Sequence, residues 1–183
     1  MSFAPEVRME GFGNVDFVIA DVDQSNNVRQ FLSVELQAID ITGSVYPAYE
    51  SMIQNNPLPS KPSYSFNWDN VYKRFITQLI RKGYYHHHWN SKIVAIIQEA
   101  VYQNIRARAD FITSNDLMSP NVNIIFLTYD YEEEENGSGY TLTMKTIAGT
   151  HHSNLQSAIL YKTPPSRDAF CSHIIRNLRP LNG

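Results

Sequence analysis

An apolar run at residues 31–41 is interrupted by two polar side chains. Its apolar members are Phe31, Leu32, Val34, Leu36, Ile39 and Ile41. Because strand side chains alternate with a period of two, Glu35 and Gln37 share one face and the residues between them lie on the other. A carboxylate in a largely buried strand is costly unless it is paired or binds a metal. The run therefore predicts a core strand that carries a functional site.

A second predicted strand, residues 15–21, brings another acid to the same place. Glycine and asparagine at residues 11–14 tolerate the positive φ of a tight turn, which would join this strand to a shorter one at residues 6–9. If the strands at 15–21 and 31–40 pair, Asp16 can join Glu35. The two acids would then lie close together at the edge of a sheet.

Two neighbouring carboxylates repel each other, so both stay ionised only if a positive charge lies between them. Magnesium with oxygen ligands is the usual solution, and we expect Asp16, Glu35 and the backbone carbonyl of Leu36 as ligands. Such an ion can generate hydroxide and stabilise the charge on a phosphodiester during hydrolysis. Two alternatives stay open. The acids could be solvated surface groups, or they could be the acid and base of a glycoside hydrolase that works without metal.

The rest of the chain predicts a mixture of helices and strands in one domain. We expect helices at 44–54, 66–82 (ended by Gly83), 90–106 (capped by Asn90) and 166–178, strands at 121–131 and 140–147 joined by a turn at 135–139, and a loop at 55–62. The length of 183 residues favours a single domain at 1–183. No stretch has the length of a membrane span, and acidic residues stand where a signal peptide would be apolar. We therefore expect a cytoplasmic protein with no membrane partner.

The charge of the chain is segregated. The net charge of −3 argues against a nucleic-acid partner, yet residues 61–108 hold eight Lys or Arg and only two acids. Phosphate neutralisation supplies most non-specific affinity for DNA, so this segment favours a DNA-binding surface. The pairs Lys73-Arg74 and Arg81-Lys82 lie one to two turns apart on a predicted helix and could contact phosphates. For any one of these residues, a merely solvated side chain is the alternative.

Histidine clusters and a lone cysteine give further limits. Three consecutive side chains, His86 to His88, cannot converge on one ion in regular structure, so we expect a loop there. His151-His152 could be a pair of metal ligands, but we expect an exposed turn there. Cys171, the single cysteine, excludes an intramolecular disulfide and any multi-cysteine metal site built from this chain alone.

The segments 11–21 (GFGNVDFVIAD) and 31–49 (FLSVELQAIDITGSVYPAY) resemble the catalytic core of the NotI-type restriction endonucleases, which belong to the PD-(D/E)XK nuclease superfamily. In this resemblance Asp16 is the first acid and Glu35 the second. Gln37 stands where most of the superfamily has a lysine. The similarity is specific over residues 35–43, extends to about Arg108, and is fainter beyond it.

The resemblance implies an α/β (α+β) fold, a restriction-endonuclease-like mixed β-sheet flanked by helices, without an N-terminal extension that relatives have. It implies a bacterial, homodimeric type II restriction endonuclease that cuts double-stranded DNA at a GC-rich palindromic site with Mg²⁺. Asp16 and Glu35 would hold the metal, and Gln37 would orient the attacking water or a phosphate oxygen. An amide supplies hydrogen bonds but no cation. The alternative is a catalytically inactive DNA-binding remnant of the same fold.

Overall fold

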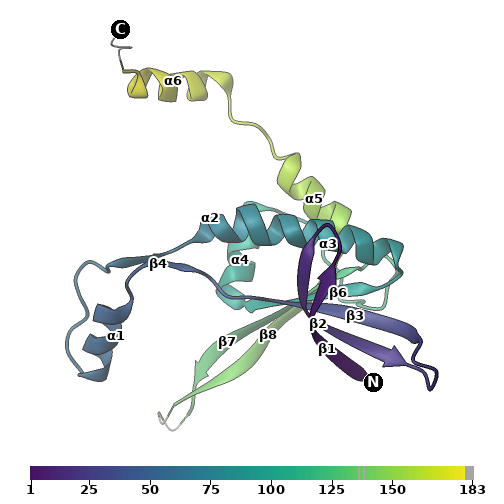
Figure 1. Cartoon of the computed structure of the whole chain (residues 1–183). Coiled ribbons are helices and arrows are strands. Elements are labelled where there is room, and N and C mark those ends of the chain that lie inside the picture. Colours follow the sequence, from purple (N-terminus) through teal and green to yellow (C-terminus); the bar gives the residue numbers. More distant parts are fainter. Residues whose placement is uncertain (136, 138, 180–183) are drawn as a thin grey trace.

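A mixed β-sheet lies at the centre of the computed structural model, which describes residues 1–135, 137 and 139–179 (Figure 1). Over these residues the sheet has six strands in the order β1-β2-β3-β6-β7-β8. Their bounds are β1 Ser2–Met9, β2 Gly13–Val22, β3 Val28–Gln37, β6 Lys92–Gln98, β7 Ile124–Glu133 and β8 Tyr140–Thr150. The β3-β6 and β6-β7 pairs are parallel, and the outer pairs are antiparallel. The mixed sheet flanked by helices confirms the expected fold class.

Helices cover one face of this sheet. A continuous helical segment runs through α2 (Trp68–Asn70), the π-helix η1 (Val71–Ile76) and α3 (Thr77–His88), and α5 (His152–Leu160) lies beside α3 (Figure 1). The helix α4 (Glu99–Arg108) packs against β6 and β7. A small sheet of β4 (Ile41–Gly43) and β5 (Tyr64–Phe66), with α1 (Tyr46–Ile53), extends to one side, and α6 (Arg167–Asn177) extends beyond α5. No helix in the described residues combines the length and apolarity of a membrane span.

The hydrophobic core lies between the sheet and these helices. Its largest fully buried side chains include Ile93 on β6, Phe126 on β7, Leu79 on α3 and Ile105 on α4. The register pairs residues 33, 35 and 37 of β3 with residues 93, 95 and 97 of β6. Because neighbouring residues in a ladder share a face, Glu35 points toward the core helices, and not toward the opposite face of the sheet.

The prediction of a helix from Asn90 to Arg106 is wrong in its first half. Residues 92–98 form β6, the parallel strand at the middle of the sheet, and the helix begins only at Glu99. A strand buried on both faces is a continuous apolar run, and such a run satisfies a helical period as well as a strand period. Ile93, Val94 and Ala95 are all buried, which is typical of such a strand.

The predicted end of a helix at Gly83 and the predicted loop at residues 86–88 are also wrong. The helix α3 continues through Gly83 to His88, and residues 151–152 cap and begin α5 instead of forming an exposed turn. Gly83 is required for close packing: a Cβ there would lie 2.8 Å from Cδ1 of Ile124 and 3.1 Å from Cβ of His152. The hairpin between β7 and β8 is present, but Asn136 and Ser138 of its predicted turn lie outside the described residues.

We expect Gly83→Ala to destabilise the protein by about 1–3 kcal/mol, because the added methyl overpacks the contact of α3 with the buried Ile124. Urea unfolding of the two proteins measures the difference. Gly139→Ala is the matched control, since a Cβ at Gly139 meets no atom within 4 Å. Equal stability of the Gly83→Ala variant and the parent would show that this close approach is not present.

Candidate active site

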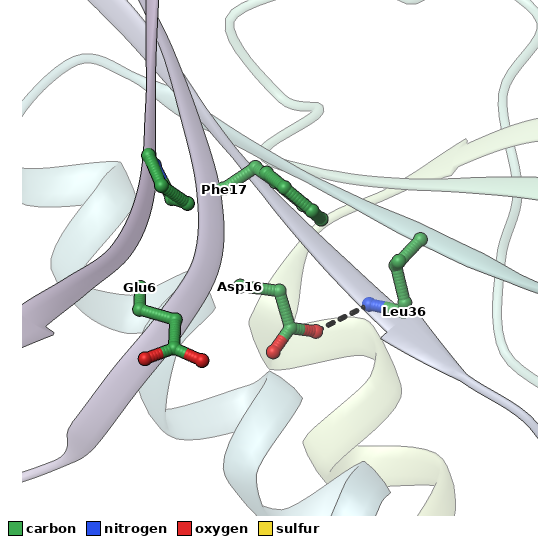
Figure 2. Close-up of a pocket in the computed structure, with 5 residues that line it drawn as sticks. Glu6, Asp16, Phe17 and Leu36 are labelled. Carbon is green, nitrogen blue, oxygen red and sulfur yellow. Dashed lines mark hydrogen bonds between the residues drawn. The ribbon is translucent and has the colours of Figure 1, made fainter.

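Asp16 and Glu35 lie next to each other across two strands. The β2-β3 register pairs Phe17 with Val34, which puts Asp16 opposite Glu35 at the point where the ladder ends. The carboxylate of Asp16 reaches across to β3, where its Oδ2 accepts a hydrogen bond of 2.7 Å from the backbone N–H of Leu36 (Figure 2). The two acids therefore share the helix-covered face of the sheet, at the same level along it.

Glu35 forms a buried ion pair with Lys82 of α3. The Nζ of Lys82 lies 2.5 Å from Oε1 of Glu35 and donates a second hydrogen bond, 2.7 Å long, to the backbone carbonyl of Asn14. The side chains of Lys82 and Glu35 are only 4% and 11% exposed. The pair joins α3 to β3, and the Asn14 contact adds the start of β2. Its charges are therefore held at a defined place beside Asp16.

Burial raises the pKa of Glu35, and the nearby charge of Asp16 raises it further, while the hydrogen bond and charge of Lys82 act in the opposite direction. The carboxylate thus needs positive charge nearby in order to stay ionised. Lys82 supplies one such charge within the chain. A divalent cation between the two carboxylates would supply another.

A second buried contact fixes α3 above β3. His86, one helical turn after Lys82, contacts Oγ of Ser33 through Nε2 (2.7 Å) and the carbonyl of Lys82 through Nδ1 (2.8 Å). His86 is fully buried, and this burial lowers its pKa. Since Ser33 and Glu35 stand on the same face of β3, these contacts align α3 with that strand. They hold Lys82 over Glu35.

Asp16 also lines an open pocket of about 620 Å³ together with Pro5, Glu6, Phe17 and Leu36. The carboxylates of Glu6 and Asp16 point to the same side (Figure 2). The β1-β2 register pairs Pro5 with Phe17 and Val7 with Val15, so Glu6 stands opposite Asp16. Glu6 adopts a positive φ of 50°, which is unusual for a glutamate within a strand.

Sequence reasoning missed Glu6, because the predicted hairpin has the right strands but the wrong register. The predicted turn at residues 11–14 implies a hairpin, but counting outward from it places Glu6 across from Ile19; the observed pairing of Met9 with Gly13 puts Glu6 across from Asp16. Three carboxylates therefore lie on three successive strands, β1, β2 and β3. Carboxylate oxygens in this number form a donor set that suits a hard divalent cation.

Gln37 stands on the same face of β3 as Glu35, but its amide is turned to the local backbone. Its Nε2 donates a hydrogen bond to the carbonyl of Ala38, one residue along the chain. Of the three polar side chains expected to converge, Asp16 and Glu35 are therefore neighbours, and Gln37 has a different partner. Leu36 lines the pocket, and its backbone N–H donates a hydrogen bond to Asp16.

The four cations expected to contact DNA fall into two groups. Lys73 and Arg74 are exposed on η1, where Lys73 pairs with Asp69 at 3.1 Å. Arg81 is exposed on α3, and its guanidinium lies over the ring of Phe12. Lys82 does not belong to this surface, because it is buried against Glu35. Adjacent positions on a helix face different directions, which explains the separation of Arg81 from Lys82.

Comparison with known protein families identifies the family of this chain. A family model of the restriction endonuclease NotI matches residues 4–142, a range that includes Glu6, Asp16, Glu35, Gln37 and Lys82. No curated protein matches the chain. The matched range covers the sheet from β1 into β8 with α3 and α4. The chain therefore belongs to the NotI restriction endonuclease family, whose members cleave DNA as type II restriction enzymes.

Proposed function

We propose that this protein is a magnesium-dependent type II restriction endonuclease that hydrolyses double-stranded DNA at a GC-rich palindromic site. The observation that carries the proposal is the meeting of Asp16 and Glu35 on one face of the sheet, with the buried ammonium of Lys82 beside them. A glycoside hydrolase is not supported by the family match or by the exposed cations on η1 and α3. Palindromic DNA has two-fold symmetry, so we also propose a homodimer with one site for each strand.

The donor set fits Mg²⁺. Asp16 and Glu35 would hold the ion, the carbonyl of Leu36 would be a third oxygen ligand, and Glu6 is a further carboxylate at the same pocket. When bound, Mg²⁺ supplies activation of the attacking water and stabilisation of the charge on the phosphate. The hydrogen bond from the Leu36 N–H holds the Asp16 carboxylate in place before any ligand arrives.

Lys82 supplies the positive charge that the glutamine at position 37 cannot. It reaches Glu35 from α3 and not from the strand. A cation fixed at this place stabilises the negative charge that develops on the phosphate oxygens during hydrolysis. Gln37 contributes hydrogen bonds: once its amide turns away from the Ala38 carbonyl, its Nε2 can orient the attacking water or a phosphate oxygen.

The exposed cations on η1 and α3 would hold the DNA. Lys73 and Arg74 on η1 and Arg81 on α3 are placed to contact phosphates, which fix the position of the duplex but carry no sequence information. Base recognition would require side chains at base edges in the major groove. Arginine paired with guanine through two hydrogen bonds is the contact expected for a GC-rich site.

Asp16→Asn tests the proposed catalytic carboxylate. The asparagine keeps an acceptor for the Leu36 N–H but loses the charge, so we expect cleavage of GC-rich plasmid or genomic DNA with Mg²⁺ to fall by about a hundredfold or more while the melting temperature changes little. Glu10→Gln, an exposed acid outside the pocket, is the control. A parent protein that binds DNA but never cuts it would identify the inactive remnant. Full activity of Asp16→Asn would contradict the assignment of Asp16.

Lys82→Met tests the buried ion pair. Removal of the ammonium leaves Glu35 buried without its partner, so we expect a loss of about 3–5 kcal/mol in the free energy of urea unfolding. The double variant Lys82→Met/Glu35→Gln should regain much of that loss, because no unpaired charge is left. Lys73→Met removes an exposed pair as the control, and its effect should stay within about 0.5 kcal/mol. If the effects of Lys82→Met and Glu35→Gln, each made alone, simply add up in the double variant, the coupling is refuted.

Arg74→Gln tests the exposed cations. If Arg74 contacts a phosphate, the slope of log affinity against log salt concentration should become shallower by about one, with similar weakening for different DNA sequences. Fluorescence anisotropy with labelled duplexes in Ca²⁺ or EDTA measures this slope without cleavage. Arg176→Gln on α6, outside the basic segment, should leave the slope unchanged. An unaltered slope for Arg74→Gln would place the duplex elsewhere.

A further inference from the structure

Three imidazoles from two helices meet where α3 ends and α5 begins. His87 lies in the last turn of α3, His151 caps α5, and His152 is the first residue of α5. One ring nitrogen from each of them lies within 4.8 Å of the other two. The ring centroid of His87 lies 4.8 Å from that of His151 and 5.4 Å from that of His152. The chain thus brings together residues that are 64 positions apart.

We propose that His87, His151 and His152 form a binding site for a divalent transition-metal ion of the Zn²⁺ class, separate from the carboxylate pocket. Two imidazole nitrogens on one tetrahedral zinc, each bound at about 2.0–2.1 Å, lie about 3.3 Å apart. The separation of Nε2 of His151 from Nδ1 of His87 is 3.3 Å. This pair therefore already has the spacing of one edge of a zinc tetrahedron.

Contacts behind the rings hold two of the three ligands. Nδ1 of His151 contacts Oγ of Ser153 at 2.7 Å and accepts from its backbone N–H at 3.3 Å, so Nε2 is the nitrogen that faces His87. Asn123 holds His152 by two contacts. Oδ1 of Asn123 accepts a hydrogen bond from the backbone N–H of His152 (2.9 Å), and Nδ2 of Asn123 contacts Nδ1 of the His152 ring (3.0 Å). Such outer contacts orient imidazoles at metal sites. The three donor nitrogens lie within 4.8 Å of one another, so side-chain shifts of about 1–2 Å would bring them to the spacing of a zinc site.

The donor atoms of the cluster also suit this class of metal. The nitrogen donors select zinc-class ions over Mg²⁺, which prefers oxygen. With three protein ligands and His87 at the surface, the fourth position would be open to water.

The ion would tie α5 to the helix that carries Lys82 and His86. Both of those residues contact β3, so the position of α3 matters for the acidic pocket, while the metal itself would lie at the end of α3, one to two turns after Lys82. We therefore assign the site a structural role. Its loss should lower thermal stability, and it should not remove the Mg²⁺-dependent chemistry.

Metal binding can be measured directly on the full chain. Protein stripped with EDTA and dialysed is titrated with Zn²⁺ by calorimetry, with Mg²⁺ in excess so that the carboxylates are occupied. We expect one Zn²⁺ per chain and a rise in melting temperature of about 5–10 °C at a hundredfold excess over Kd. Co²⁺ should give the visible absorption of a tetrahedral site with nitrogen ligands. Absence of stoichiometric Zn²⁺ binding would overturn the proposal.

Variants assign the ligands. His87→Gln and His151→Asn should each weaken Zn²⁺ binding by at least tenfold; asparagine at position 151 can still cap α5. His88→Gln is the matched control, because His88 is also exposed and is next in sequence but lies outside the triad. Undiminished binding in the His87→Gln/His151→Asn double variant would refute the site. Asp16→Asn should bind Zn²⁺ normally, so this result does not depend on whether the acidic pocket is catalytic.

Discussion

The ion pair between Glu35 and Lys82 is the contact on which the arrangement of the acidic pocket depends. A buried carboxylate beside a second carboxylate would otherwise take up a proton, since both burial and the charge of Asp16 raise its pKa. The ammonium offsets this effect from within the core. Buried pairs add little net stability, because desolvation cancels much of their attraction. The pair is therefore better explained by what it positions: an ionised acid on β3 under a fixed cation on α3.

The rest of the site follows from strand geometry. Antiparallel pairing of β1 with β2 and of β2 with β3 puts residues 6, 16 and 35 side by side. The two-residue alternation gives Asp16 and Glu35 the same face, and the carboxylate of Glu6 points to the side of Asp16 (Figure 2). A shift of one residue in the β2-β3 register would send Asp16 to the opposite face and separate it from Glu35. Burial of Val34, which precedes Glu35 and points the other way, opposes such a shift. Packing of apolar neighbours thus maintains the polar site.

Local patterns in the sequence were enough to predict the β1-β2-β3 segment and the nearness of Asp16 to Glu35. The turn glycines, the alternation around Glu35 and the polar loop before β3 all act over short distances. The partners that come from far along the chain could not be predicted in this way. The sequence predicts that Lys82 is a surface cation like Arg81. The packing of α3 on β3 shows that Lys82 is buried. The sequence predicts a helix where β6 lies, because an apolar run shows no strand alternation when residues on both faces are buried.

The histidine cluster is a second case in which contacts between distant parts of the chain could not be predicted from the sequence. Three consecutive histidines cannot share an ion, and that argument is correct for His86, His87 and His88 taken alone. In the fold they diverge around α3: His86 turns to Ser33, His88 packs against Tyr84, and His87 meets the histidines of α5. Gly83 makes this meeting possible, because the absence of a side chain lets α3 approach Ile124 and His152 closely. One helix thus presents a cation to the acids on β3 and, one to two turns later, an imidazole to α5. Oxygen donors gather at the first place and nitrogen donors at the second, so the two clusters differ in the metals that they can bind.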